Sequence, residues 1–431
     1  MGQNSKIGWT TDTENDMVGC ERATIDVDGR EPVPSPACGN CYAEDLMARK
    51  LTASHLRVID ERGVWNGTIN KVPYVLSRIQ SRPRDGSIKR TFAPSLSDPF
   101  LQSFIENPDG LLWCIARLAR MICIPWVDWQ VLTKRPKGML LVLKQIKERG
   151  PKGMMQAVDT LMRTYTTRTN GKGETVPIDW GRLEKLAAEH IPSTPFPYPN
   201  ICFGTTVENE LAARDRLQYL IAARLGGLIS TSFVSYEPAL GPVDWDTYLA
   251  VGGIDWLIIG GESGPYARPM HPEWVREAIS AATRYGVPVF FKQHGAWSTT
   301  KIEGKQTREA RYLDYDKTDG IDEPFAERAP VTMYRVGKAA AGMKCPPQAR
   351  GPRRLSSPYV FEWPVLRHEQ RHAWAHTSDV AAGDTVYLTD ELARAAGIDP
   401  VRIDLPDIYR RCVAARSIRA DYGDEHHFLL R

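Results

Sequence analysis

The cysteines Cys20, Cys38 and Cys41 are the residues whose type and spacing most clearly suggest chemistry. Cys38 and Cys41 form a Cys-x2-Cys pair, and seventeen residues separate Cys20 from that pair. Three thiolates can hold three corners of a [4Fe–4S] cluster, or a tetrahedral zinc ion if a fourth ligand joins them. The spacing alone leaves open a cluster, a structural zinc site and a set of buried thiols. In a cluster with three protein ligands, the fourth iron can bind a small molecule directly.

The segments around these cysteines predict a strand, a long loop and a helix. We expect a short strand over residues 6–10, and an exposed, proline-bearing loop over residues 21–37. Apolar residues at helical spacing predict a helix over residues 42–51. Cys41 then lies at a helix N-terminus, a position that lowers the pKa of a thiol and favours the metal-binding thiolate.

Six further segments share one pattern, in which a short apolar run ends in polar or charged residues. Helical patterns over residues 209–223 and 272–285 separate some of these runs, which indicates βα units and a parallel sheet of about seven strands. A βα barrel carries its active site at the carboxyl ends of its strands. The pattern therefore favours a partial or complete (β/α) barrel over a doubly wound sheet, which gathers its site only at a switch point. The polar ends are 95–98, 133–135, 205–208, 235–237, 260–263 and 292–293.

The chain divides into a barrel over residues 1–345, a linker over 346–357 and a small α+β domain over 358–431. Residues 150–199 read as an insertion in the barrel, with a helix over 180–190. Residues 299–329 are charged and rich in turn-forming residues, which is typical of a loop. The linker is rich in Pro and Arg, and short β-like runs with one Ala-rich helix follow it.

Composition limits the class of protein. The chain has 431 residues, of which 42% are hydrophobic and 25% charged, as in ordinary globular proteins. It has no apolar run long enough for a membrane span and no secretory signal, and its cysteines are too few for a disulfide scaffold. We therefore expect a cytoplasmic protein, in the host cell if the gene belongs to a phage. A net charge of +3 does not by itself indicate a nucleic-acid partner.

The order of short motifs resembles the phage Gp37/Gp68 family over about residues 6–343. That family is similar to a divergent branch of the radical S-adenosylmethionine (SAM) enzymes, which use a partial or full βα barrel and a three-cysteine [4Fe–4S] cluster. Two features depart from the common pattern of those enzymes: the gap between Cys20 and Cys38 is longer, and Asn40 stands where an aromatic residue is usual. The matching motifs are IGWT at 7–10, GC at 19–20, CGNCYAE at 38–44, SLSD at 95–98, LTKRP at 132–136, TVEN at 206–209, EPALGP at 237–242, GGESG at 260–264, RPM at 268–270, FKQ at 291–293 and RVGK at 335–338.

The resemblance implies roles for these residues. Cys20, Cys38 and Cys41 would ligate three irons, and SAM would chelate the fourth through its amine and carboxylate. One-electron reduction by an electron donor would cleave SAM, and the 5′-deoxyadenosyl radical would abstract a hydrogen from the substrate. For SAM binding we expect Ser95, Ser97 and Asp98 near the ammonium, Thr206 and Glu208 near the ribose, and close backbone approach at Gly260 and Gly261. Facing the substrate we expect the catalytic residues Glu237, Glu262, Lys134 and Lys292.

The phage setting of the family suggests DNA or a modified nucleotide as substrate, for example for rearrangement of a modified base. Such a base would have to leave its stack to reach a barrel mouth. Two basic clusters suit phosphate contacts, although runs of charge are common on solvated surfaces. They are Arg82, Arg84, Lys89 and Arg90, and the linker arginines Arg350, Arg353 and Arg354.

Two other functions fit parts of the sequence. In a zinc-stabilised nucleic-acid-binding protein, the three cysteines and a fourth ligand such as His55 would be structural, but the polar strand ends would be unexplained. In a metal-dependent nuclease or hydrolase, carboxylates would surround a divalent ion. Those carboxylates would be Asp98, Glu208, Glu237 and Glu262.

Overall fold

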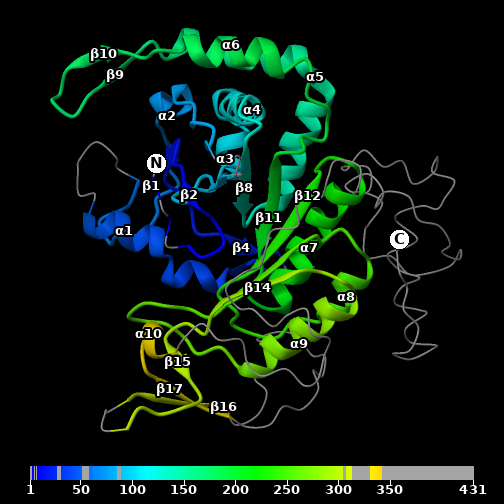
Figure 1. Cartoon of the computed structure of the whole chain (residues 1–431). Helices are drawn as coiled ribbons and strands as arrows, with labels where there is room; N and C mark the ends of the chain where they lie inside the picture. Colours follow the sequence, from blue (N-terminus) through cyan, green and yellow to red (C-terminus); the bar gives the residue numbers. More distant parts are fainter. Residues whose placement is uncertain are drawn as a thin grey trace, which may run out of the picture.

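The computed structural model describes residues 2–3, 5, 7–26, 31–50, 58–84, 89–303, 307–312 and 331–341. Its centre is an eight-stranded sheet in which seven neighbouring strands are parallel and follow chain order (Figure 1). An antiparallel strand, β1 (Gly2–Gln3), flanks β2 at one edge. The parallel strands are β2 (Asp12–Thr13), β7 (Lys89–Phe92), β8 (Val127–Thr133), β11 (Ile201–Thr206), β12 (Thr231–Tyr236), β13 (Leu257–Gly260) and β14 (Val289–Gln293).

The helices that alternate with these strands share one large core with one face of the sheet. Strand residues such as Trp129, Phe203, Tyr236 and Ile259 point into this core. Sequential strand order with the βα helices in a single core is the arrangement of a partial (β/α) barrel rather than of a doubly wound sheet. The helices are α4 (Pro108–Ile122), α5 (Pro136–Thr164), α6 (Gly181–His190), α7 (Glu210–Leu225), α8 (Trp245–Ala250) and α9 (Pro272–Arg284).

The opposite, inner face of the sheet carries a second and smaller core. Phe92, Cys202, Phe233 and Ile258 come from β7, β11, β12 and β13 and pack with Trp9 from the N-terminal segment. Strand residues alternate between the two faces, and β11, β12 and β13 carry apolar side chains on both sides. This explains why the continuous apolar runs in the sequence correctly indicated six of the seven parallel strands.

The expected first strand over residues 6–10 is wrong. Residues 7–9 form a turn, and the first parallel strand is the polar pair Asp12–Thr13 of β2. Two buried ion pairs join the residues after β2 to α4: Arg120 with Glu14, and Arg117 Nε with Asp16 Oδ1 at 3.0 Å. Polar contacts rather than an apolar run therefore fix this edge, which is why hydrophobic patterning missed it.

The insertion does not begin at residue 150 as expected, because that position lies within a helix. The helix α5 runs through that position and bends at Gly150, whose φ is 58°. The polar stretch after α5 forms a hairpin of β9 (Thr167–Thr169) and β10 (Thr175–Pro177), and α6 confirms the helix expected over 180–190. Figure 1 shows the hairpin and α6 extending beyond the sheet.

The remaining elements are short. Residues 299–329, expected as a loop, contribute β16 (Glu309–Tyr312) to a sheet with β15 (Trp297–Ser298) and β17 (Val331–Arg335), as far as that segment is described. The linker and C-terminal domain expected after residue 345 lie outside the described residues. The other elements are β3 (Met17–Val18), β4 (Thr24–Ile25), β5 (Val33–Pro34), β6 (Asn70–Lys71), η1 (Pro36–Asn40), α1 (Tyr42–Lys50), α2 (Pro73–Ser77), α3 (Gln102–Ile105) and α10 (Lys338–Ala341).

Across the described part of the chain, the helices lack the length and apolar character needed to cross a bilayer.

Candidate functional site

The cysteine segment lies along the carboxyl edge of the parallel sheet. Gly19, the residue before Cys20, forms a parallel β-bridge with Ser97, which follows β7. Ser97 Oγ donates to Gly19 O at 2.6 Å, and Gly19 N donates to Leu96 O at 3.1 Å. Gly19 has a φ of 114°, and a Cβ there would lie 2.0 Å from Thr68 O. Only glycine therefore fits at the point where the chain turns to present Cys20.

The Cys-x2-Cys segment is fastened to two other strand ends. Cys38 lies in η1, and Cys41 directly precedes α1, as the helical spacing predicted. Ser35 Oγ donates to Glu208 Oε1 at 2.8 Å, beyond the end of β11. Asn40 Nδ2 donates to Glu262 Oε2 at 3.1 Å, beyond the end of β13. Both ends of η1 are thus held by buried carboxylates of the sheet edge.

Arg268 completes this attachment. Its guanidinium donates to both oxygens of Glu262, with Nη2 to Oε1 at 2.6 Å and Nε to Oε2 at 2.9 Å. The same Nη2 also donates to Pro36 O at 3.0 Å, at the first residue of η1. Glu262 therefore acts with Arg268 and Asn40 as a clamp on the cysteine segment. Both oxygens of Glu262 are engaged in this clamp. Contact of Glu262 with a substrate stays a prediction.

The three thiols share one neighbourhood and form no disulfides. Burial raises the pKa of Cys20 to about 12, the charges of Asp98, Cys38 and Cys41 add to this rise, and the charge of Arg135 opposes it. Arg135 Nη1 lies 3.9 Å from Cys20 Sγ. Cys20 and Cys41 pack against the same small apolar cluster.

The donor set fits a thiolate-bound metal centre in residue type and number. As placed, however, no three Cys, His, Asp or Glu side chains in the described ranges are arranged to hold a metal ion. The proposed zinc ligand His55 lies outside the described residues.

The polar groups after β7 form hydrogen bonds with other residues of the site. Ser95 N and Leu96 N both donate to Asn15 Oδ1, at 2.7 and 2.9 Å. Asp98 is buried, and its Oδ1 accepts from Thr133 Oγ1 at 2.7 Å. Its Oδ2 accepts from Lys134 N at 3.0 Å and from Arg135 Nη1 at 3.1 Å. Asp98 thus joins the ends of β7 and β8 and orients Arg135 toward Cys20.

Glu208 is the most deeply buried carboxylate at this edge, with 0% exposure. Its Oε2 accepts from Arg216 Nη1 at 2.7 Å, and Lys134 Nζ lies 3.6 Å from its Oε1. Burial raises the pKa of Glu208, but the charges of Arg216 and Lys134 and the bond from Ser35 outweigh that effect and lower it overall. Thr206, at the end of β11, is also buried, and its carbonyl accepts from Arg216 Nη1 at 2.8 Å.

A separate ion pair joins the ends of β12 and β14, where Lys292 Nζ donates to Glu237 Oε1. Burial lowers the pKa of Lys338 in α10, and the charge of Lys292 lowers it further. Tyr42 is 57% exposed in total, but its hydroxyl donates to Ser95 O. Burial of this hydroxyl and the charges of Cys41 and Glu237 raise the pKa of Tyr42. Glu237 and Lys292 therefore lie within electrostatic reach of the cysteine segment.

The two glycines after β13 permit close approach within the protein itself. A Cβ on Gly260 would meet Glu237 Cδ at 3.3 Å, and one on Gly261 would lie 2.2 Å from His294 O. The sequence predicts that this backbone approaches a cofactor. In the structure, the contact that requires glycine at position 261 is with His294, which follows β14.

The sequence reasoning missed several residues that support the site, above all Ser35, Asn40, Arg135 and Arg268. Asn40, Arg135 and Arg268 stand inside the matching motifs, which was the available signal, and Ser35 lies three residues before Cys38. The four carboxylates considered for a nuclease are instead each paired with a basic side chain. These pairs are Asp98 with Arg135, Glu208 with Arg216, Glu237 with Lys292 and Glu262 with Arg268.

Comparison with known proteins gives a family without an assigned activity. No curated protein matches the chain, and no solved structure matches it. The family described as "Protein of unknown function (DUF5131)" matches residues 4–346, which is most of the chain and includes the whole cysteine segment and every strand of the parallel sheet after β1. The chain therefore belongs to the DUF5131 family.

Proposed function

We propose that this protein is a radical SAM enzyme that holds a [4Fe–4S] cluster through Cys20, Cys38 and Cys41. The observation that carries the proposal is the grouping of three free thiols at the carboxyl edge of a parallel half-barrel sheet. That edge is where βα barrels place their chemistry. The resemblance to the phage Gp37/Gp68 family supports the same assignment. With SAM bound, such a cluster supplies reductive cleavage of SAM and abstraction of a hydrogen from the substrate.

The protein's own part in this chemistry is to position the thiols and shape their surroundings. Glu262 and Glu208 hold η1 at its two ends, and Ser97 holds the chain before Cys20. Arg135 places a positive charge beside Cys20, which partly offsets the rise in the pKa of this thiol that burial causes. The side chains of Lys292 and Glu237 are 15% and 16% exposed and pair with each other, and we assign them to substrate or cofactor contact.

For the substrate we propose a modified base in DNA, with an external electron donor and a cytoplasmic setting. This part rests on the family resemblance. The basic cluster considered for phosphate contacts does not adjoin the cysteines, because Lys89 and Arg90 begin β7 at the amino edge of the sheet. The linker arginines lie outside the described residues.

The deciding experiment is anaerobic purification and reconstitution of the full chain, followed by addition of SAM and dithionite. We expect about four irons per chain, a brown chromophore and release of 5′-deoxyadenosine. Cys41→Ala should give little iron and no 5′-deoxyadenosine. One zinc per chain with no product would instead establish the structural-zinc alternative. Magnesium-dependent hydrolysis of DNA without SAM would establish the nuclease.

A further inference from the structure

The N-terminal motif Gly8-Trp9-Thr10 has no role in the proposed chemistry, yet it lines a pocket at the amino edge of the half-barrel. This cavity of about 80 Å³ adjoins the inner core, and its lining residues Arg90, Trp256 and Phe290 lie at the starts of β7, β13 and β14, at the end of the sheet opposite the cysteines. Trp9, Trp256 and Phe290 supply its aromatic walls, and Arg90 reaches into it from the start of β7. Gly8 and Thr11 are exposed and mark its opening to solvent.

The aromatic walls are fixed. The ring centroid of Trp256 lies 6.4 Å from that of Trp9 and 6.5 Å from that of Phe290, both in edge-to-face geometry. Gln130 Nε2 donates to Trp9 O at 3.2 Å, and Thr10 Oγ1 donates to Arg90 O at 2.9 Å. These contacts anchor the Trp9 segment on the sheet, so the pocket is preformed.

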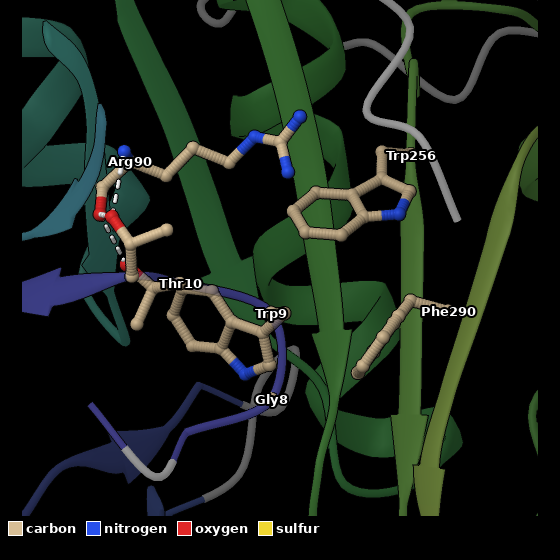
Figure 2. A pocket seen from close by; sticks show the side chains of 7 residues that line it. Gly8, Trp9, Thr10, Arg90, Trp256 and Phe290 are labelled. Atoms are coloured by element: carbon tan, nitrogen blue, oxygen red, sulfur yellow. Dashed lines mark hydrogen bonds between the residues drawn. The ribbon is translucent and has the colours of Figure 1, made fainter. Parts of the chain in front are cut away.

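The indole nitrogen of Trp9 is a buried donor in this pocket that a ligand could engage. Trp9 is 6% exposed, and within the described residues its indole Nε1 finds no hydrogen-bond partner. Figure 2 shows this nitrogen on the side of the ring where Gly8 lies. Buried donors without partners are uncommon because they lose their bond to water without a replacement. An acceptor atom on a bound molecule would satisfy it.

The charge of the pocket decides which ligand suits it. Three aromatic walls alone would suit an organic cation, but the guanidinium of Arg90 opposes one. Asp128 stands opposite Arg90 in the register of β7 and β8, so the two side chains share the inner face and their charges offset each other. The surroundings therefore favour a neutral ligand over a cation or an anion.

The volume limits its size. An enclosed cavity of about 150 Å³ holds benzene, so about 80 Å³ takes in only part of a six-membered ring, and the rest of the ring extends through the opening beside Gly8 and Thr11. From the walls, the unsatisfied donor, the balanced charge and the volume, we propose that this pocket binds a single neutral heteroaromatic ring bearing a carbonyl oxygen. The carbonyl accepts from Trp9 Nε1, and the ring packs against Trp256 and Phe290.

The test uses uracil as the probe. Calorimetry and ligand-observed NMR measure its binding to the full-length protein. We expect a dissociation constant of about 0.1–1 mM. Benzoate, tetramethylammonium and benzene serve as anionic, cationic and acceptor-free competitors, and each should bind more weakly than uracil. No uracil binding at about 10 mM would overturn the proposal, as would tighter binding of any of the three competitors.

Matched variants separate the pocket from general effects on the fold. Trp9→Phe keeps a ring and removes the donor, so uracil should bind about three- to tenfold more weakly. Gly8→Ala adds a Cβ about 3.1 Å from Phe290 Cζ and should weaken binding by crowding the pocket. Trp245→Phe is the control, because Trp245 Nε1 is likewise buried without a partner among the described residues but lies in the outer core.

Equal losses in Trp9→Phe and Trp245→Phe would also overturn the proposal. Thermal unfolding of each variant verifies that it folds. If Trp9→Phe does not fold, Gly8→Ala serves as the test of the proposed pocket. Unchanged uracil binding in Gly8→Ala contradicts the proposal. The pocket and the thiols lie at opposite edges of the sheet, so a failure here leaves the proposed radical chemistry untouched.

Discussion

Glu262 shows how a residue at a strand end can matter without touching a substrate. Its carboxylate is 6% exposed and accepts hydrogen bonds from Asn40 and Arg268, which together hold η1. Hydrogen bonds to a charged group are stronger than neutral ones, so this clamp is a firm polar attachment of the Cys-x2-Cys segment. The position of Cys38 and Cys41 therefore depends on a residue more than two hundred positions away.

Glu262→Gln should loosen that segment. The amide keeps the shape of the side chain but loses the charge that pairs with Arg268, at a local cost of about 1.5–3 kcal/mol. We expect faster hydrogen exchange over residues 36–41 and a lower iron content after anaerobic reconstitution. Glu237→Gln is the control, because its partner Lys292 does not contact η1. Equal exchange rates in Glu262→Gln and the parent protein would refute the clamp.

Asp215 supplies a prediction about pH. Burial raises the pKa of Asp215 from 3.8 to about 6, against the opposing charge of Arg216. Since the folded-state pKa lies above the unfolded one, the folded state gains stability from the protonated form below pH 4 and loses it as the pH rises to 6. Asp215→Asn should therefore stabilise the protein at pH 7 by at most about 2–3 kcal/mol, with little gain near pH 4.

Urea unfolding at pH 4.5 and pH 7 measures this difference. Asp159→Asn is the matched control, because Asp159 forms an exposed i,i+4 pair with Arg163 and should change the free energy of unfolding by less than about 0.5 kcal/mol. A destabilised Asp215→Asn at pH 7 would show that the carboxylate is favourable as an ion.

At the scale of elements, α4 and the short strand β2 depend on each other. Arg117 and Arg120 are almost fully buried and reach from α4 to Asp16 and Glu14, just beyond β2. Burial raises the pKa of Glu14, although the charges of Arg120 and Arg117 oppose this effect. Breaking one partner of a buried pair leaves the other charge uncompensated, which is costlier than losing a surface pair.

Arg120→Ala should lower the free energy of unfolding by about 3–5 kcal/mol at pH 8. The loss should be smaller at pH 5, because an unpaired Glu14 can then bind a proton in the folded state. Denaturant unfolding at both pH values is the measurement. Arg163→Ala removes an exposed pair and should cost less than about 1 kcal/mol at either pH. A loss in Arg120→Ala that does not vary with pH would contradict this account.

The ends of β13 and β14 are joined through Gly261. A Cβ at this position would lie 2.2 Å from His294 O and 2.6 Å from His294 C, and both contacts are with backbone that cannot turn aside. Gly261→Ala should therefore destabilise the protein by roughly 1–3 kcal/mol through displaced backbone. In contrast, Gly171→Ala at the hairpin tip meets nothing within 4 Å and should be nearly neutral. Thermal unfolding of the two variants compares them, and equal melting temperatures would disprove the close approach.

On the scale of the whole molecule, the sheet separates two sites. The cysteine segment covers its carboxyl edge, and the pocket of Trp9, Trp256 and Phe290 lies at its amino edge. The seven-residue strand β8 spans roughly 20 Å between the two edges. Residues this far apart with no shared partners usually act independently.

Cys41→Ala and Trp9→Phe should therefore be additive. We expect the double variant to change the free energy of unfolding by the sum of the single changes within about 0.5 kcal/mol. A double-mutant cycle by urea unfolding tests this. A coupling energy above about 1 kcal/mol would show that the two edges communicate through the inner core.

The sequence by itself determined the parallel βα architecture and the polar carboxyl edge. Both follow from local patterns: continuous apolar runs mark strands buried on both faces, and polar residues follow each run. It also placed Cys41 directly before α1, because helical spacing is readable from a few residues. It failed at β2, whose two polar residues carry no apolar signal.

Only the tertiary structure decided what the strand-end residues do. Asp98, Glu208 and Glu262 were expected to contact a cofactor or substrate, and each was found paired with a basic side chain that helps to hold the cysteine segment or its surroundings. The partner of a side chain is set by three-dimensional proximity, which links Glu262 to Asn40 across 222 positions of the chain. The Trp9 pocket appears for the same reason, because its walls come from a turn and from three separate strands or strand ends. Local sequence patterns do not reveal contacts between residues that are distant along the chain.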